Sequence, residues 1–186
     1  MLDLNNINSS WTLFLDRDGV FNYEKEEDYI LNTGEFRLYE NVLDHIDVLA
    51  RRFGTIVMVT NQKGIGKGLM TVADLDSIHQ VLLSAVQAKG GRIDRIYFAP
   101  DTDNSAINRK PQPGMAWQAK ADFPHIDFTK SIMVGNKPSD MRFGRNAGMY
   151  TVFVATTHPE TPFPHPDIDL RFNDLDSFAQ ALKQLE

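Results

Sequence analysis

Two carboxylates stand one residue apart directly after a short apolar run at residues 11–15: Asp16 and Asp18. Side chains at positions i and i+2 of an extended segment point to the same side, and Gly19 lets the chain turn away without adding a side chain there. Two such acids repel each other unless a cation or a proton lies between them. Carboxylate oxygens are hard ligands that suit Mg²⁺. The pair therefore indicates metal-assisted acid/base chemistry, although a solvated turn carries the same pattern.

Three further polar clusters follow later apolar segments of the chain. They occupy residues 60–64 (TNQKG), 109–111 (RKP) and 135–140 (GNKPSD). Thr60 and Asn61 offer a hydroxyl and an amide that can hold phosphate oxygens, and Lys110 can balance charge that develops on a phosphorane. Asp140 also has a structural alternative, because acids commonly cap helix N-termini. Taken together, these groups are the ones that phosphoryl transfer requires.

The elements that must position these clusters alternate between strand-like and helix-like segments. Residues 55–60 (TIVMVT) are apolar or β-branched throughout, as in a strand covered on both faces. The alternation predicts an α/β fold with a doubly wound, mainly parallel sheet, in a single domain over residues 1–186. Ligands bind beyond the carboxyl ends of such strands, so the four clusters are expected at one edge. The predicted strands are 11–15, 55–60, 93–99, 131–134 and 151–155, and the predicted helices are 42–53, 71–89, 113–121, 139–147 and 174–185.

The composition restricts the classes of protein to which the chain can belong. Its 186 residues suit one domain, and 42% hydrophobic with 24% charged residues is an ordinary balance for a globular protein. The absence of cysteine excludes disulfides, thiolate zinc sites and a cysteine nucleophile. A net charge of −6 without a basic stripe argues against nucleic-acid binding. There is neither a signal-peptide pattern nor an apolar run of about 18 residues, so we expect a cytoplasmic protein without a membrane partner.

Four longer segments surround the polar clusters. They are FLDRDGVFN at 14–22, TNQKGIGKG at 60–68, RKPQPGM at 109–115 and VGNKPSDMRFGRNAGM at 134–149. In this order they resemble the haloacid dehalogenase (HAD) superfamily of phosphohydrolases. The segments look like the branch that contains phosphatases of D-glycero-D-manno-heptose 1,7-bisphosphate and of histidinol phosphate. The resemblance runs from about residue 11 to the C-terminus and implies a Rossmann-like HAD core without a cap domain.

The resemblance implies a catalytic role for each member of the carboxylate pair. Asp16 would be the nucleophile that attacks phosphorus and forms a phospho-aspartyl intermediate. Asp18 would protonate the leaving alkoxide and then activate the hydrolytic water, a role that contributes roughly 10²–10⁴-fold to a rate. Phosphate and substrate contacts are expected from Thr60, Asn61, Lys110 and Arg109.

The resemblance also implies Mg²⁺ as cofactor. Its ligands would be the Asp16 carboxylate, the Asp18 backbone carbonyl and residue 136, with Asp140 in support. Position 136 is usually aspartate in the family, but this chain has Asn136. An amide oxygen can still coordinate Mg²⁺, but the site then lacks one formal negative charge. We therefore expect weaker metal affinity with the chemistry retained.

A second departure concerns zinc. Many members of this branch carry a Cys/His cluster between the third strand and the Arg-Lys motif. Here residues 99–108 (APDTDNSAIN) are shorter and contain neither Cys nor His. We therefore expect no structural zinc.

The lack of an inserted cap predicts an open site, closed only by loops such as residues 23–37 and 101–109. The expected substrate is a small phosphorylated metabolite, first of all a sugar bisphosphate such as D-glycero-D-manno-heptose 1,7-bisphosphate, with histidinol phosphate as the alternative. A catalytically impaired phosphate-binding protein, with Asn136 as the lesion, also stays open. A phospho-accepting receiver module is disfavoured because no acceptor aspartate follows the second strand. The sequence allows a monomer or a small homo-oligomer.

Overall fold

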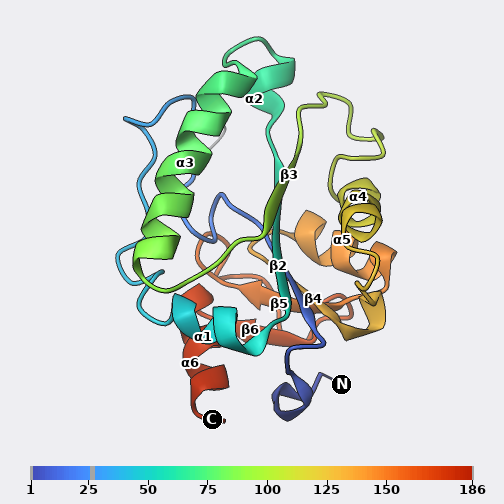
Figure 1. Ribbon diagram of the computed structural model, residues 1–186. Coiled ribbons are helices and arrows are strands. Elements are labelled where there is room, and N and C mark those ends of the chain that lie inside the picture. The colour runs from blue at the N-terminus through green and yellow to red at the C-terminus, as the bar shows by residue number, and fades with distance from the viewer. Residues whose placement is uncertain (1, 26–27, 186) are drawn as a thin grey trace.

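A single sheet of six parallel strands forms the centre of the protein (Figure 1). The structure, a computed structural model, describes residues 2–25 and 28–185. The strand order is β3-β2-β1-β4-β5-β6, so the chain runs outward from β1 in one direction and then in the other. This order confirms the predicted doubly wound α/β fold. The strands are β1 (Thr12–Leu15), β2 (Thr55–Asn61), β3 (Arg95–Ala99), β4 (Ser131–Gly135), β5 (Tyr150–Val154) and β6 (Leu170–Phe172).

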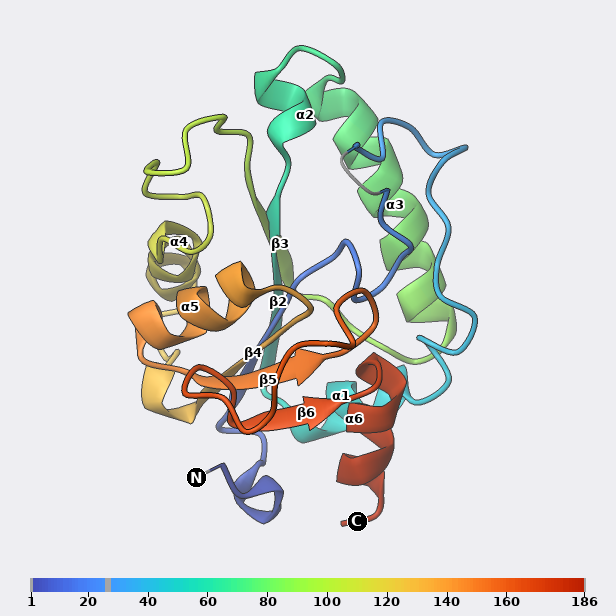
Figure 2. The same ribbon diagram turned by 180° about the vertical axis from the view of Figure 1, so that it is seen from behind.

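Helices cover both faces of the sheet (Figures 1 and 2). Successive side chains of a strand point to opposite faces. Leu13 and Leu15 therefore pack with α1, α3 and α6, whereas Phe14 packs with α4 and α5. Burial on both faces explains the unbroken apolar sequence of β1. The helices are α1 (Ile46–Arg52), α2 (Lys63–Gly66), α3 (Val72–Ala88), α4 (Gly114–Asp122), α5 (Pro138–Ala147) and α6 (Leu175–Lys183).

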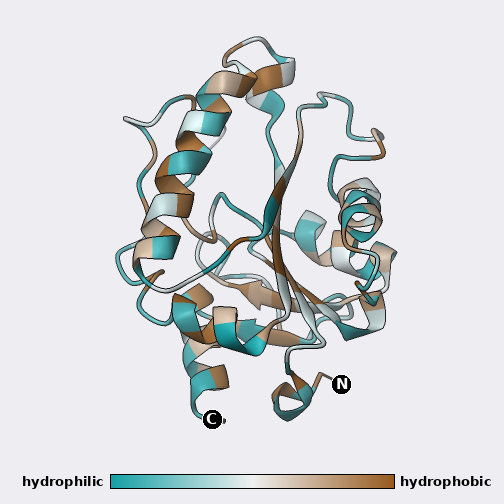
Figure 3. Ribbon diagram, viewed as in Figure 1, coloured by the Kyte–Doolittle hydropathy of each residue, from teal (hydrophilic) through white to brown (hydrophobic). Residues whose placement is uncertain are grey.

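Local signals set the ends of α3 and α5 as the sequence predicts. Thr71 and Asp74 form a reciprocal capping box at the start of α3. Along its length α3 alternates between hydrophobic and hydrophilic residues, as an amphipathic helix does (Figure 3). Helix α5 begins at Pro138 and ends before Gly148, whose φ of 88° lies in the left-handed region. Both signals act within a few residues, so they can be read without the tertiary structure.

The structure corrects several predicted boundaries. The helix predicted over residues 42–53 begins only at Ile46, and turns occupy residues 41–45. Val42 is nevertheless 5% exposed, so its apolar character reflects burial in the core and not helical structure. Four short elements were not predicted from the sequence: α2, β6 and the 3-10 helices Leu4–Asn6 and Phe128–Lys130. Each of these has three or four residues, too few to show a recognisable period.

No cap domain is inserted within residues 2–25 and 28–185, where the helices and strands form the sheet and the layers around it. The segment between β1 and α1 forms a long loop that packs Phe21 and Val42 into the main core. None of the helices in the described part of the chain has the length and apolarity needed to cross a bilayer.

Candidate active site

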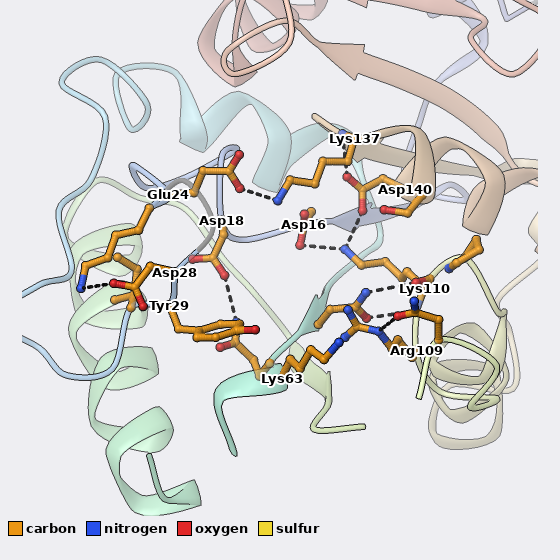
Figure 4. Close-up of a pocket in the computed structure, with 17 residues that line it drawn as sticks. Asp16, Asp18, Glu24, Asp28, Tyr29, Lys63, Arg109, Lys110, Lys137 and Asp140 are labelled. Atoms are coloured by element: carbon orange, nitrogen blue, oxygen red, sulfur yellow. Dashed lines mark hydrogen bonds and ion pairs between the residues drawn. The ribbon is translucent and has the colours of Figure 1, made fainter. Parts of the chain in front are cut away.

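A cavity of about 450 Å³ lies beyond the carboxyl ends of β1, β2 and β4. Parallel strands place their carboxyl ends together, which brings the four polar clusters to this edge. The loop after β1 and the loop between β3 and α4 close the sides of the cavity, as predicted (Figure 4). The predicted site residues that line the cavity are Asp16, Asp18, Asn61, Arg109, Lys110 and Asp140.

Lys110 lies between two buried carboxylates. Its Nζ is 2.7 Å from Oδ1 of Asp16 and 2.7 Å from Oδ1 of Asp140. Burial raises the pKa of Asp16 to about 7; the charge of Asp140 adds to this rise and that of Lys110 opposes it. Burial alone would lower the pKa of Lys110, but the two carboxylates outweigh it, so this pKa is raised. Lys110 therefore remains a cation directly beside the predicted nucleophile.

Asp140 uses both of its oxygens within the protein. Oδ1 pairs with Lys110, and Oδ2 accepts a hydrogen bond of 3.0 Å from the backbone N–H of Lys137. The second contact caps the start of α5. Gly135 leaves the room for this arrangement, because a Cβ at that position would overlap the Asp140 side chain. Asp140 therefore holds Lys110 in the site and also caps the N-terminus of α5. The functional and the structural interpretation of this residue both apply.

Asp18 accepts hydrogen bonds from three side chains. Arg17 donates to Oδ1 at 3.2 Å from Nε and 2.9 Å from Nη2, and Asn22 donates to the same oxygen at 2.9 Å. Gln62 donates to Oδ2 at 3.0 Å. Burial opposes the ionisation of Asp18, but the charge of Arg17 and these hydrogen bonds outweigh it and lower the pKa of Asp18. The two carboxylates of the D-x-D pair thus have pKa values shifted in opposite directions.

Arg17 itself is fully buried between Asp18 and α3. Its Nη1 lies 3.3 Å from Nε2 of His79, and its guanidinium lies 5.8 Å from the centre of the Phe36 ring. Burial, with repulsion from Arg17, lowers the pKa of His79 to about 4, so the imidazole is neutral at pH 7. His79 can then accept a hydrogen bond from Arg17. The contact gives His79 a structural role in holding Arg17.

The end of β2 supplies three neighbouring polar side chains with different contacts. Asn61 bonds the backbone of Lys110 twice: its Nδ2 donates to the carbonyl at 3.1 Å, and its Oδ1 accepts from the N–H at 3.0 Å. Thr60 is buried, and its hydroxyl accepts a hydrogen bond of 2.8 Å from Gln62. Thr60 thus lies behind the cavity wall and contacts it through Gln62, whereas Asn61 reaches the cavity itself.

Asn136 is completely buried beside the turn after β1. Its Nδ2 donates a hydrogen bond of 2.7 Å to Oγ1 of Thr157. Its Oδ1 is buried and has no hydrogen-bond partner among the residues that the structure describes. A buried carbonyl oxygen without a donor is uncommon and requires an explanation, such as an ion or a water molecule.

The donor set near Asp16 suits a hard divalent cation. Within the described residues no group of three or more His, Cys, Asp or Glu side chains could hold a metal. Carboxylate, peptide carbonyl and amide oxygens are, however, the ligands that Mg²⁺ prefers. The candidate ligands of these three kinds are the Asp16 carboxylate, the Asp18 carbonyl and the Asn136 amide. Oδ1 of Asn136 lacks a hydrogen-bond partner in the described part of the chain, so it is an oxygen that a cation would satisfy.

Charged residues of both signs and the aromatic Tyr29 surround the mouth of the cavity (Figure 4). Lys137 pairs with Glu24 at 2.6 Å and so connects the α5 turn to the loop after β1. Arg109 is held by hydrogen bonds of 3.1 Å to Asn104 and 3.3 Å to the carbonyl of Asp101. Lys63 and Tyr29 also line this rim. The rim can therefore attract a second anionic group of a substrate.

Several residues of the site were missed in the sequence analysis. Arg17 stands between the two aspartates, and its flanking acids are the local signal that was overlooked. Gln62 directly follows the predicted Thr60-Asn61 pair, yet its contact with Asp18 joins segments 44 residues apart. Glu24 and Lys137 are ordinary charged residues in the sequence, and nothing local distinguishes them.

Comparison with known proteins agrees with the motifs. The D-glycero-beta-D-manno-heptose-1,7-bisphosphate 7-phosphatase of Escherichia coli (strain K12) is 32% identical over 181 residues, covering 92% of this chain and 93% of that protein. The corresponding phosphatase of Chlorobaculum tepidum is 33% identical over 165 residues, covering 82% of each chain. The crystal structure of D,D-heptose 1,7-bisphosphate phosphatase from B. bronchiseptica, complexed with magnesium and phosphate, aligns with a TM-score of 0.84 and 27% identity, covering 95% of this chain and 99% of that one.

The family model for HAD-hydrolase-like proteins matches residues 107–166, which include the Arg-Lys motif and the segment around Asn136. The similarity to the curated relatives extends over most of both chains and not only over the motifs. It confirms the resemblance inferred from the sequence. The chain therefore belongs to the HAD-like hydrolase family and is a phosphatase, similar to the heptose bisphosphate phosphatases.

Proposed function

We propose that this phosphatase hydrolyses a small sugar bisphosphate through a phospho-aspartyl intermediate on Asp16, with Mg²⁺ as cofactor. The observation that carries the proposal is the arrangement of Asp16, Asp18 and Lys110 around one cavity, with Lys110 Nζ 2.7 Å from Asp16. A carboxylate nucleophile, an acid/base group and a fixed cation are the parts that the reaction needs.

The first step is attack of an Asp16 oxygen on phosphorus, which forms an acyl-phosphate and breaks the bond to the leaving alkoxide. Lys110 stabilises the negative charge on the nucleophile and on the transferring group, because its charge is fixed and desolvated. Mg²⁺ would be held by the Asp16 carboxylate, the Asp18 carbonyl and Oδ1 of Asn136, with Asp140 in support. When bound, it supplies positive charge that favours the ionised form of Asp16 and neutralises phosphate oxygens.

Asp18 would give a proton to the leaving alkoxide and later take one from the water that hydrolyses the acyl-phosphate. Arg17 holds the pKa of Asp18 low in the free protein. A phosphate ester in the cavity brings negative charge close to this carboxylate, which raises its pKa. We infer that Asp18 takes up its proton when the substrate binds. Gln62 and Asn22 keep the carboxylate oriented through both states.

The relatives support a heptose bisphosphate as the substrate. Curated proteins 32% and 33% identical to this chain are heptose-1,7-bisphosphate 7-phosphatases. The cavity of about 450 Å³ and its cationic rim are consistent with a sugar that carries a second phosphate. Histidinol phosphate is the alternative within the same chemistry. It has a cationic amine and no second phosphate, so it would gain nothing from Arg109 and Lys63 at the rim.

Phosphate release tests the proposal. Purified protein with saturating Mg²⁺ is given D-glycero-D-manno-heptose 1,7-bisphosphate, histidinol phosphate and other sugar phosphates. We expect turnover of the heptose bisphosphate, abolished by Asp16→Asn. The matched control is Asp127→Asn, the same change at an exposed carboxylate that does not line the cavity, and it should be silent. Lack of release from every ester at high Mg²⁺ would favour an impaired phosphate-binding protein, with Asn136 as the cause.

A further inference from the structure

The contact between Asn136 and Thr157 links the end of β4 to the loop after β5. The two residues are 21 positions apart, and their side chains form a hydrogen bond of 2.7 Å from Nδ2 to Oγ1. Strands β4 and β5 are adjacent, with Gly135 opposite Phe153, so the segments that follow them leave the sheet side by side. Asn136 is completely buried and Thr157 is half-buried. The hydrogen bond is therefore partly shielded from bulk water.

The two ends of the Asn136 amide have different chemistry. Nδ2 carries two hydrogens and can only donate, whereas Oδ1 can only accept or coordinate a cation. Thr157 contacts the nitrogen end. The oxygen end is buried, and residues 2–25 and 28–185 offer it no hydrogen-bond donor. Buried oxygens without a partner are rare in folded proteins.

Gly19 also lies directly beside the Asn136 amide. A Cβ at Gly19 would overlap the amide nitrogen of Asn136, and the φ of 80° at Gly19 is itself unfavourable for other residues. Thr156, the neighbour of Thr157, donates a hydrogen bond to the carbonyl of Gly19. Residues 156 and 157 thus bond both the turn after the D-x-D pair and the amide that follows β4.

We propose that Thr157 is a positioning residue for the metal site: its hydroxyl binds the Asn136 amide nitrogen and so leaves Oδ1 directed to the cation. The inference rests on the proposed function, since it assumes a divalent cation at Asn136. An amide turned by 180° would present its NH₂ group to the cation, which is repulsive. An aspartate has oxygens at both ends and has no such requirement. The orienting contact from Thr157 is therefore needed because residue 136 is asparagine and not aspartate.

The proposal predicts that the effect of Thr157 depends on the residue at position 136. Thr157→Val keeps the shape of the side chain and removes the hydroxyl. In the native Asn136 background we expect about tenfold weaker metal binding, within the range found for groups that orient metal ligands. In the Asn136→Asp background the same change should weaken binding by less than about threefold, because either carboxylate oxygen can face the cation. Thr157→Ser retains the hydroxyl and should bind metal nearly as the native protein does.

The experiment is a titration of full-length protein with Mn²⁺, a spectroscopic substitute for Mg²⁺, in which electron paramagnetic resonance reports the free ion. The variants are Thr157→Val and Thr157→Ser, with Thr157→Val also combined with Asn136→Asp. The control is Thr161→Val, which alters another half-buried threonine of the same loop whose hydroxyl forms no hydrogen bond within the described residues. Metal-free melting temperatures identify any variant that does not fold, and Thr157→Ala then replaces the valine variant.

Equal Mn²⁺ affinity of the native protein and Thr157→Val would overturn the proposal. An equal loss from Thr157→Val in the native and the Asn136→Asp backgrounds would do the same, since it would mean a general structural effect. No substrate is present in this titration. A protein that binds Mn²⁺ in a Thr157-dependent way but hydrolyses no ester would therefore refute the proposed function and leave this inference standing.

Discussion

The side-chain amide of Asn61 forms hydrogen bonds with both the backbone N–H and the backbone carbonyl of Lys110, at 3.0 and 3.1 Å. The two residues are 49 positions apart and come from β2 and from the loop before α4. The double contact holds the main chain of Lys110, and Lys110 in turn places its ammonium between Asp16 and Asp140. Asn61 is thus connected through Lys110 to Asp16, the predicted nucleophile, whose negative charge Lys110 neutralises.

Removal of the Asn61 amide should misplace Lys110. For Asn61→Ala we expect kcat/KM to fall about 100-fold, because an ångström-scale displacement of a catalytic group has effects of that order. Asn61→Asp keeps an oxygen that accepts from the Lys110 N–H but loses the donor, so its activity should lie between the two. Steady-state kinetics on the heptose bisphosphate measure both variants. Activity of Asn61→Ala close to that of the native protein would contradict this role.

Asparagine at position 136 should weaken metal binding. Asn136→Asp is nearly isosteric and restores one negative charge beside the cation, so we expect the Mg²⁺ concentration for half-maximal activity to fall about tenfold. The measurement is phosphate release as a function of Mg²⁺. Asn41→Asp adds the same charge at an exposed position and serves as the control. Unchanged Mg²⁺ dependence of Asn136→Asp would show that the amide is not a ligand.

Arg17 should contribute strongly to stability as well as to the site. Arg17→Met leaves the Asp18 carboxylate without its cation in a mostly buried position, and such changes cost about 3–5 kcal/mol in the free energy of unfolding. Arg37→Met removes an arginine whose ion pair with Glu40 spans 3.6 Å at the exposed surface, so it should cost less than about 1 kcal/mol. Urea unfolding compares the two. Similar losses from both variants would contradict the view that burial decides the effect.

His79 should make the protein sensitive to mild acid. Burial lowers its pKa to about 4 in the folded protein, whereas the unfolded chain binds the proton near pH 6.5. Protons therefore favour the unfolded state as the pH falls from 6.5 to 4, and the resulting loss is roughly 3 kcal/mol at most. His79→Gln keeps an acceptor for Arg17 and removes the titration. The free energy of unfolding of this variant should decline less over that range; parallel pH profiles would contradict the assignment.

The absence of structural zinc remains a prediction. Residues 99–108 carry no Cys or His, so the segment lacks the ligands on which a structural zinc site depends. Elemental analysis of purified protein should find far less than one zinc ion per chain. Stoichiometric zinc that survives dialysis against a chelator would refute the prediction.

The amino-acid sequence alone was enough to predict the fold class and six of the residues that line the cavity. Both depend on local patterns: buried strands read as unbroken apolar runs, and the polar cluster after each strand must lie at the carboxyl edge of a parallel sheet. The cap of α3 at Thr71 and the end of α5 at Gly148 were readable for the same reason, since their hydrogen bonds and backbone angles involve only neighbouring residues.

The contacts among these residues follow from tertiary packing and could not be predicted from the sequence. The burial of Arg17 against His79 joins positions 62 apart, and the bond from Asn136 to Thr157 joins positions 21 apart. Such contacts depend on which strands are neighbours and on the space left by residues such as Gly19. Neither feature produces a periodic pattern in the sequence. Strand β6 was missed because its three residues are too few to show a recognisable period. The type of chemistry could thus be predicted from the residue types. The positions of the reacting groups could not, because they depend on tertiary packing.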